Sequence, residues 1–518
     1  MSEDAVTSEL EHDAAWRRLD MRMLLVHPVN EVVRFLPLLI GLFLFGASDH
    51  SDPWHYLGVA LPIAIGLLRF ASTSFRITGS QIELRRGIIG RSVLTAPLDR
   101  VRTVELTAKP IHRLLRLSRV EIGTGSAATS GEGRLVLDSL GAGEARRLRE
   151  DLLHRAPLPS PGDPVAASGV PAPPESVILR LDPAWVRYAP LTTSGLVIAL
   201  AALAGASQFL GNLVRAALDA SSLDEDVRAL PLAVSLPLGV VLFAIVISVL
   251  AICGYLLTNW GFMLSRDEAA QTFHVRRGLL TTRETSIDTG RLRGVEIHEP
   301  LGLRLAGGGR LTAIVTGFKR RGNDSKTPMV PAAPRAVVAA VGDAVLAENG
   351  PLHTALIQHG PIARRRRYVR AVIPTTLIPV LLAVLATTAS WPWWLAGVGL
   401  LAPALGVLLA RDRYARLGHA LTTDYVVMRW GSLHGRRDAL QRTGIIGWNI
   451  KQTFFQRRAG VVSLTATTAA GQQSYEMLDV PEGMAVAFAI EAVPGLVEQF
   501  ATRLSNAPQS ADPALKCT

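Results

Sequence analysis

Two short blocks decide the fold of this chain: Arg85–Ile89, which reads RRGII, and Arg100–Leu106, which reads RVRTVEL. Related blocks occur twice more at the same spacing, at Arg276–Leu280 with Arg291–Ile297 and at Arg429–Leu433 with Gly444–Ile450. An arginine follows each second block at one further fixed interval, at positions 113, 304 and 457. Anchors that stay in register without a gap indicate an internal repeat.

The residues around these blocks predict β-structure. In the first copy β-branched residues and turn glycines predict strands at Phe75–Ile77, Gln81–Arg85, Ser92–Ala96, Val101–Leu106, Arg119–Ile122 and Arg134–Leu137. Each copy then changes to a helical period, which predicts closing helices at Gly143–His154, Ala332–Leu346 and Glu482–Phe500, the last kinked or ended at Pro494. We therefore expect each copy to be a small, mostly antiparallel sheet or barrel with one C-terminal helix.

Apolar runs precede each copy in pairs. A helix needs about 20 apolar residues to cross a bilayer, and most of these runs approach or reach that length: Val32–Ala47 with Trp54–Phe70, Leu191–Leu210 with Leu230–Trp260, and Ala371–Ser390 with Trp391–Ala410. The first pair is short, so a shallow re-entrant hairpin is the alternative to two spans there. The positive mean hydropathy of the chain agrees with a membrane protein.

The charges around the pairs predict their orientation. Lys and Arg are absent from the turns within the first and third pairs, whereas arginines gather outside the pairs, notably in the run Arg364–Arg367. Because cytoplasmic loops collect basic residues, we expect a multi-pass protein of the plasma membrane with both termini in the cytoplasm. The formal charge of +11 then needs no nucleic acid as a partner. The tryptophans at 391, 393 and 394 suit an aromatic anchor at the opposite surface.

The predicted organisation is a membrane α+β protein with three repeats, each a transmembrane helix pair followed by a strand-rich segment. We call 71–155, 261–350 and 411–503 the first, second and third segments. The remaining parts are the cytoplasmic tail 1–31, the helix pairs 32–70, 177–260 and 351–410, the Pro/Ala/Gly-rich linker 156–176 and the C-terminal tail 504–518.

The first segment resembles a known family. Its RRGII strand end, the block Leu98–Leu106, the run Ile111–Leu117 and the strand Val120–Thr124 are similar to the bacterial pleckstrin-homology-like (PH-like) domain. The alternation of helix pairs with such segments resembles the YdbT-type membrane proteins. The resemblance implies a PH-like fold, a partly open β-barrel closed by a C-terminal helix, and it implies little about activity because fold does not fix function. The third segment departs from the pattern at Gly444 and Asn449.

Enzyme signatures are absent from the sequence. It holds no phosphate-binding loop ending in Lys-Ser/Thr, no His-Glu-x-x-His and no Gly-x-Ser-x-Gly. Its two cysteines, Cys253 and Cys517, cannot form a cysteine metal cluster, and the histidines share no ligand spacing. We therefore expect no catalytic residues, no cofactor and no metal, and a surface position for His112.

The arginines are the candidate contacts for lipid or a partner. The recurring set could hold anionic lipid head groups or an acidic partner at the inner leaflet, or could be structural, with Arg100 and Arg291 paired to Glu105 and Glu296. The run before the third pair could bind anionic lipid or serve only as a charged anchor. The candidates are Arg100, Arg102, Arg113, Arg291, Arg293, Arg304, Arg457, Arg364, Arg365, Arg366 and Arg367.

Three functions compete. The first is a non-enzymatic membrane scaffold whose cytoplasmic PH-like repeats bind lipid, another membrane protein or a second copy, a class that suits envelope stress or antimicrobial resistance. The second is a transporter or lipid-moving protein that uses the six helices, which hold few polar residues. The third, an enzyme at the membrane surface, is disfavoured by the missing motifs.

Overall fold

The computed structural model describes residues 16–18, 22, 74–78, 81–86, 92–97, 103–123, 134–154, 175–192, 195, 197, 232–316, 327–348 and 350–496. By its internal contacts the chain divides into two compact units. Unit 1 comprises Met1–Pro183, Ile252–Leu292 and Thr316–Arg321, and unit 2 comprises Ala184–Ala251, Arg293–Val315 and Gly322–Thr518. The division therefore falls inside the second segment. The first predicted helix pair, residues 156–174 of the predicted linker and most of the predicted helix Leu191–Leu210 lie outside the described residues.

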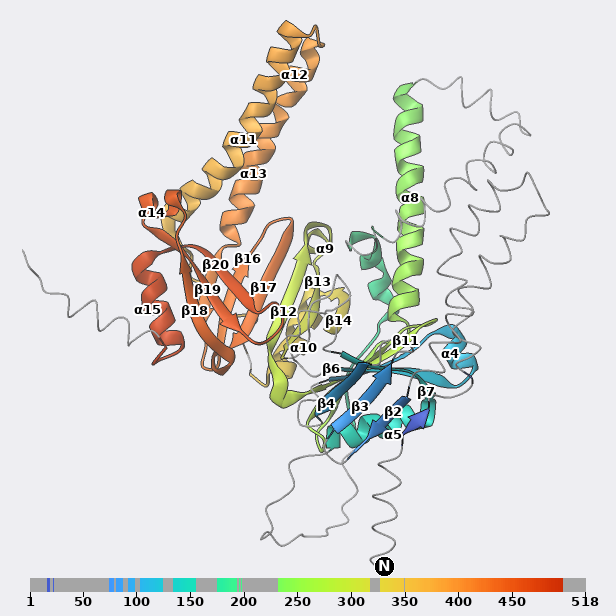
Figure 1. Ribbon diagram of the computed structural model, residues 1–518. Coiled ribbons are helices and arrows are strands. Elements are labelled where there is room, and N and C mark those ends of the chain that lie inside the picture. The colour runs from blue at the N-terminus through green and yellow to red at the C-terminus, as the bar shows by residue number, and fades with distance from the viewer. Residues whose placement is uncertain are drawn as a thin grey trace, which may run out of the picture. The chain divides into compact units, whose positions relative to one another are not determined.

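Three apolar helices in the described part of the chain are long enough to cross a membrane: Val240–Asn259, Gly360–Thr388 and Trp393–Ala415. The first belongs to α8 (Leu232–Asn259), the second is α11 (Gly360–Thr388), and the third is α12 (Trp393–Gly399) continued by α13 (Leu401–Ala415). α11 and α13 run side by side as a hairpin (Figure 1). A Cβ on Gly406 would lie 2.3 Å from Thr375 Oγ1, so a small residue is needed for this close packing.

Unit 1 holds two antiparallel sheets. The first has the order β1-β2-β3-β4 and the second the order β7-β6-β5-β11-β10-β9-β8. The strands are β1 (Arg17–Arg18), β2 (Ser74–Ile77), β3 (Gln81–Arg86), β4 (Ser92–Pro97), β5 (Thr103–Ala108), β6 (Leu117–Gly123), β7 (Arg134–Gly141), β8 (Ser176–Arg180), β9 (Met263–Asp267), β10 (Thr272–Arg277) and β11 (Thr282–Asp288). Its helices are α4 (Pro110–Leu114), α5 (Ala142–His154) and the 3₁₀ turn η3 (Thr289–Arg291).

Unit 2 also holds two antiparallel sheets, with the orders β14-β13-β12-β17-β16-β15 and β18-β19-β20. The strands are β12 (Leu292–Pro300), β13 (Gly308–Val315), β14 (Thr327–Pro334), β15 (Gly418–Leu421), β16 (Tyr425–Trp430), β17 (His434–Gln441), β18 (Ile445–Lys451), β19 (Val461–Thr468) and β20 (Ser474–Pro481). Besides α11 to α13 its helices include α9 (Leu301–Leu305), α10 (Arg335–Leu346), α14 (Phe454–Ala459), α15 (Glu482–Ala492) and the 3₁₀ elements η2 (Pro183–Leu191) and η4 (Arg442–Gly444).

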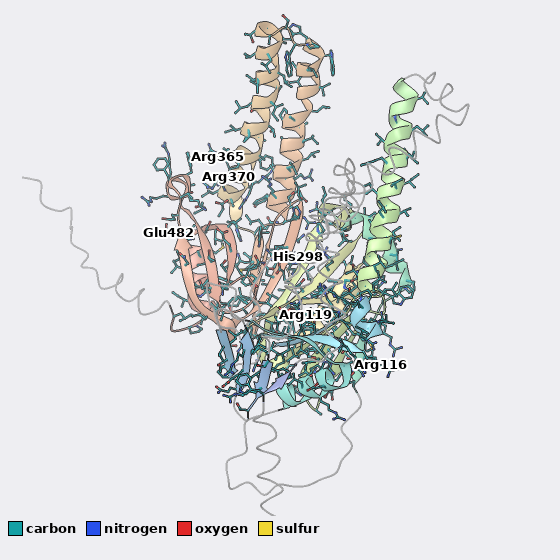
Figure 2. All side chains as sticks on the ribbon, turned by 45° about the vertical axis from the view of Figure 1, so that its right-hand side comes forward. Arg116, Arg119, His298, Arg365, Arg370 and Glu482 are labelled. Atoms are coloured by element: carbon teal, nitrogen blue, oxygen red, sulfur yellow. The ribbon has the colours of Figure 1, made fainter. Side chains whose placement is uncertain are left out.

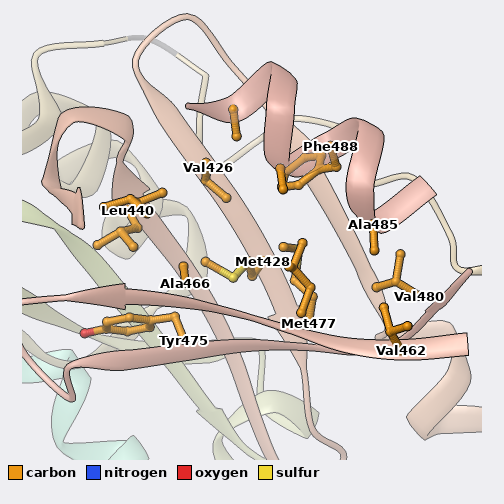
Figure 3. Packing of buried hydrophobic residues seen from close by; sticks show 14 of the residues in the cluster. Val426, Met428, Leu440, Val462, Ala466, Tyr475, Met477, Val480, Ala485 and Phe488 are labelled. Atoms are coloured by element: carbon orange, nitrogen blue, oxygen red, sulfur yellow. The ribbon is translucent and has the colours of Figure 1, made fainter. Parts of the chain in front are cut away.

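A hydrophobic core lies between two sheets in the first and third segments. In the third segment Val426, Met428 and Leu440 from β16 and β17 meet Val462, Ala466, Met477 and Val480 from β19 and β20, and α15 covers one side with Ala485 and Phe488 (Figure 3). In the first segment Ile82 and Leu84 of β3 share a core with Val104 and Leu106 of β5 and with Leu148 of α5. Burying such side chains contributes about 1.5–3 kcal/mol each, so both segments have a core of their own.

The six predicted strands of the first segment are present with changed bounds, β5 being described from Thr103 because Val101 and Arg102 lie outside the described residues, and the predicted helix after each segment is also present with changed bounds. The helix predicted from Ala332 begins at Arg335, because Thr327–Pro334 forms β14. The helix predicted from Glu482 ends at Ala492, two residues before Pro494. Hydrogen bonding continues from one segment to the next, since β5 pairs with β11 and β12 pairs with β17. No sequence pattern predicts these connections.

The chain segments that flank each predicted helix pair are paired with each other. β1 pairs with β2 across the first pair, β8 pairs with β9 across the second, and Ile357 bridges to His419 across the third. All three pairings are antiparallel. The described chain therefore leaves and re-enters the β-structure at paired positions on either side of each predicted helix pair.

Candidate functional site

The base of α11 is fastened to the third segment by two ion pairs to one buried carboxylate. Arg366 Nε lies 3.0 Å from Asp479 Oδ1, and an amino nitrogen of Arg367 lies 3.0 Å from Asp479 Oδ2. Asp479 is almost fully buried and has a positive φ of 56°. A non-glycine residue in this region carries backbone strain, and the two guanidinium groups hold its carboxylate in place. These two arginines therefore hold the helix hairpin to the β-structure.

α14 is fixed in the same network. Gln456 donates through Nε2 to Asp479 Oδ1 at 3.0 Å and to Ser463 Oγ at 2.9 Å. Thr453 and Gln456 form a capping box at the start of the helix, which satisfies backbone N–H groups that would otherwise lack partners. Arg366 also donates to the Phe455 carbonyl oxygen at 2.8 Å. α14 is thereby held against the first turns of α11.

The outer side of this fixed helix carries aromatic and basic side chains together. Phe454 and Phe455 are each 71% exposed, with ring centroids 5.5 Å apart. Arg457 and Arg458 are exposed on the same short helix. On α11 the arginines that do not bind Asp479 are exposed, and Figure 2 shows Arg365 and Arg370 where the helix hairpin meets the third segment. We call Phe454, Phe455, Arg457, Arg458, Arg364 and Arg365 the aromatic–basic surface.

This surface suits the boundary between water and an anionic bilayer. Aromatic side chains are enriched at membrane interfaces, and each basic residue near an anionic leaflet contributes about 1 kcal/mol. The other end of the α11–α12 hairpin carries the exposed Trp391, Trp393 and Trp394. Exposed aromatic residues therefore lie at both ends of the apolar hairpin.

A buried histidine pair lies beside the Asp479 network. His419 Nδ1 lies 3.0 Å from His359 Nε2, and His359 Nδ1 lies 2.7 Å from the Leu478 carbonyl oxygen. Burial lowers the pKa of His359, and burial together with the neighbouring His359 lowers the pKa of His419 to about 4. When the His359 Nδ1–H donates to the Leu478 carbonyl oxygen, the His359 Nε2 can accept a hydrogen bond from the His419 Nδ1–H. Both hydrogen bonds are then made with the two imidazoles neutral.

The remaining predicted arginines are dispersed, and several have structural partners. Arg304 forms an ion pair with Asp412 at 3.0 Å and donates to the Ser432 carbonyl oxygen at 3.2 Å. Arg293 donates to Gln441 at 3.0 Å, and Arg291 pairs with Asp288 at 3.1 Å. The predicted pairing of Arg291 with Glu296 is therefore wrong, since a nearer carboxylate lies three residues before it. Arg113 is exposed and donates to the Leu279 carbonyl oxygen at 2.5 Å. Arg100 and Arg102 lie outside the described residues.

His112 is buried in α4, so its predicted surface position is also wrong.

Glu175, Asp267 and His274 place ligand atoms within 4.8 Å of one another, close enough to hold a metal ion. However, His274 Nδ1 lies 2.8 Å from Ser286 Oγ and its Nε2 lies 3.1 Å from Thr272 Oγ1. Both ring nitrogens thus have hydroxyl partners, which favours a structural role for His274.

The comparison with known families supports the fold. Residues 32–156 and 372–492 match the family model described as the bacterial PH domain. Two regions of the chain are bacterial PH-like. The second match ends at Ala492, the last residue of α15, and both matches include apolar helix sequence as well as the strand-rich segment. A search of curated proteins and a search of solved structures each found no match.

Several residues of this site were not among the candidates predicted from the sequence. The motif Phe454-Phe455-x-Arg457-Arg458 could have been found, because two adjacent phenylalanines beside two arginines are unusual for a solvated turn. Asp479 and the His359–His419 pair gave no sequence signal, since their partners lie far along the chain.

Proposed function

We propose that this chain is a non-enzymatic, multi-pass membrane scaffold. Its PH-like segments lie on the cytoplasmic face, and the aromatic–basic surface of the third segment rests in the head-group region of the anionic inner leaflet. The exposure of Phe454 and Phe455 beside Arg457 and Arg458, on a helix fixed to the base of α11, carries this proposal. A rigid PH-like layer on the membrane then offers a platform for other proteins or for further copies of the chain.

The flanking strand pairs support an even number of membrane crossings for each helix pair. A strand that enters a helix pair is hydrogen-bonded to the strand that leaves it, so both ends of the pair occupy the same side. The basic residues outside the pairs favour the cytoplasm as that side.

The hydroxyl groups in the described spans favour a scaffold over a transporter. Ser248 and Thr258 of α8 donate to Ala244 and Gly254 of the same helix, and Thr375 of α11 donates to Ala371. A polar path through the bilayer needs such groups turned towards solvent or substrate. These three hydroxyls instead satisfy their own helix backbone.

The depth of α14 in the bilayer tests the proposal. In a chain with Cys253→Ser and Cys517→Ser, Phe455→Cys is labelled with the environment-sensitive dye NBD, and the protein is reconstituted into nanodiscs. We expect blue-shifted emission, quenching by spin-labelled lipid, and a stronger signal with phosphatidylglycerol than with phosphatidylcholine alone. Changing Arg457 and Arg458 to Ala removes two basic contacts of about 1 kcal/mol each, so the gain from anionic lipid should largely disappear.

The matched control is Ser474→Cys with the same dye. Ser474 is exposed and begins β20, at the end of the β19–β20 hairpin away from α14. It should report water in every lipid. If Phe455→Cys behaves like Ser474→Cys in both lipids, α14 does not enter the membrane surface and the proposed lipid contact is wrong.

A further inference from the structure

The two sheets that connect neighbouring segments are built in the same way. β5 of the first segment pairs with β11 of the second, with Thr103 opposite Ile287. β12 of the second pairs with β17 of the third, with Gly294 opposite Leu440. Thr103 and Gly294 occupy the same position of the repeat, as do Ile287 and Leu440. Corresponding strands of the repeat are therefore paired in the same register at both connections.

One strand of each kind is left at a sheet edge. β18 is the counterpart of β5 and β12, and it is the first strand in the order β18-β19-β20. β4 is the counterpart of β11 and β17, and it is the last strand in the order β1-β2-β3-β4. An edge strand presents unpaired N–H and C=O groups and readily accepts another strand. The described strands thus include two complementary edges, one in the first segment and one in the third.

The side chains along these edges are exposed where their counterparts are buried. Leu106 of β5 is 6% exposed and Ile297 of β12 is 4% exposed, whereas Ile450, at the same position of β18, is 44% exposed. Val93 of β4 is 51% exposed. In addition, the buried Nε1–H of Trp448 on β18 has no hydrogen-bond partner among the described residues. Apolar residues at positions that are buried in β5 and β12 are therefore partly exposed in β18, where no further strand of the described residues pairs with this edge.

We propose that copies of this chain join head to tail, with β18 of one copy added to β4 of the next in the register of the internal connections. That register places Gly447 opposite Ala96, Trp448 opposite Thr95 and Ile450 opposite Val93. Ile450 and Val93, both exposed in the single chain, then form an apolar cross-strand pair, and the Thr95 hydroxyl lies opposite the indole of Trp448. Pro97, which has no N–H to donate, lies just beyond the last paired position.

Such an interface uses a different surface on each partner. Interfaces of this kind generate rings if the rotation closes and open filaments if it does not. The assembly deepens the scaffold function proposed above, because it makes each copy one link in a membrane-bound row. It depends on the sheet edges and not on α14, so the two proposals can fail separately.

Disulfide trapping between two differently tagged chains tests the register. Both chains carry Cys253→Ser and Cys517→Ser; one also carries Val93→Cys and the other Ile450→Cys. After co-expression and mild oxidation in the membrane, we expect a disulfide-linked species containing both tags. The control replaces Ile450→Cys by Ile446→Cys, an exposed residue of the same strand, which should give at least tenfold less of this species.

Three outcomes would overturn the proposal. One is equal crosslinking by the Ile446→Cys control, because chains that meet only by random collision would not distinguish the two positions. A second is a disulfide formed only within one chain when that chain carries both Val93→Cys and Ile450→Cys, because the two edges would then pair intramolecularly. The third is a failure to crosslink. Failure to crosslink while Phe455→Cys still reports lipid contradicts the assembly and leaves the lipid contact intact.

A charge exchange gives a second test that does not need cysteine. Both positions are exposed, so Val93→Lys and Ile450→Lys should leave the single chain folded. Together they place like charges opposite each other, and the oligomer should fall to single chains at the same concentration in mass photometry. Val93→Glu with Ile450→Lys should restore it. An oligomer unaffected by the double lysine variant excludes this interface.

Discussion

His359 and His419 lie where the α11–α13 hairpin joins the third segment, and nothing in their sequence context distinguished them from the other histidines. In the structure each ring is buried, and the rings are hydrogen-bonded to each other. The groups that face them are Asp479, Arg367 and the ring of Phe488. A charge on either histidine would be poorly solvated there, so both are held neutral at physiological pH.

This pair predicts a loss of stability in acid. The ordinary histidine pKa is 6.5, and that of folded His419 is about 4. Between these values the unfolded chain binds protons that the folded pair resists, so stability falls as pH decreases from about 6.5 to about 4 and then levels off. The loss is about 3 kcal/mol for His419. Thermal unfolding in detergent should show a lower midpoint at pH 5.0 than at pH 7.5.

His419→Asn isolates the titration, because asparagine keeps a donor near Nδ1 and does not ionise. The difference in unfolding midpoint between the two pH values should shrink in this variant. An unchanged difference would mean that other groups control the acid sensitivity.

At the scale of single elements, the backbone geometry explains why the repeated block contains a glycine. Gly278 and Gly431 follow β10 and β16 with φ of 109° and 91°. A Cβ would lie 2.0 Å from the Thr281 carbonyl oxygen at Gly278, and 2.2 Å from the His434 carbonyl oxygen at Gly431. Both glycines therefore close a hairpin turn that no residue with a side chain can form without a shift.

We expect Gly431→Ala to destabilise the third segment by about 2 kcal/mol or more, because positive φ and the blocked Cβ position both oppose the substitution. Gly483→Ala is the matched control. Gly483 lies in the first turn of α15, where a Cβ meets nothing within 4 Å, so the variant should be neutral or slightly stabilising. Equal unfolding midpoints for the two variants would contradict the turn argument.

The elements could be predicted from sequence because their signals are local. β-branched residues and turn glycines placed the strands of the first segment, and apolar length placed α8, α11 and α13. The partners of the arginines could not be predicted in this way: Arg304 pairs with Asp412 and Arg366 with Asp479, each more than a hundred residues away. The pairing of β5 with β11 is equally non-local, and only the register of the repeat hinted that the segments are alike.

For the whole molecule, the flanking strand pairs and the basic residues together predict the topology. With Cys253→Ser and Cys517→Ser, a membrane-impermeant maleimide should label Ala389→Cys in intact cells, since Ala389 lies at the α11–α12 turn. Glu144→Cys in α5 and Ser474→Cys in β20, both exposed, should be labelled only after the membrane is opened. Labelling of Ser474→Cys in intact cells would reverse the predicted orientation.

The pairing of strands between segments also sets an order of events during biosynthesis. β5 leaves the ribosome well before β11, and the helix pair that precedes β9 is synthesised between them. The seven-stranded sheet can therefore be completed only after the residues between β8 and β9 have been synthesised. The same holds for β12, which waits for α11 and α13 before β17 is made. Translation and sheet closure are thus coupled, and we expect a chain stalled between segments to expose an unfinished strand edge to chaperones and proteases.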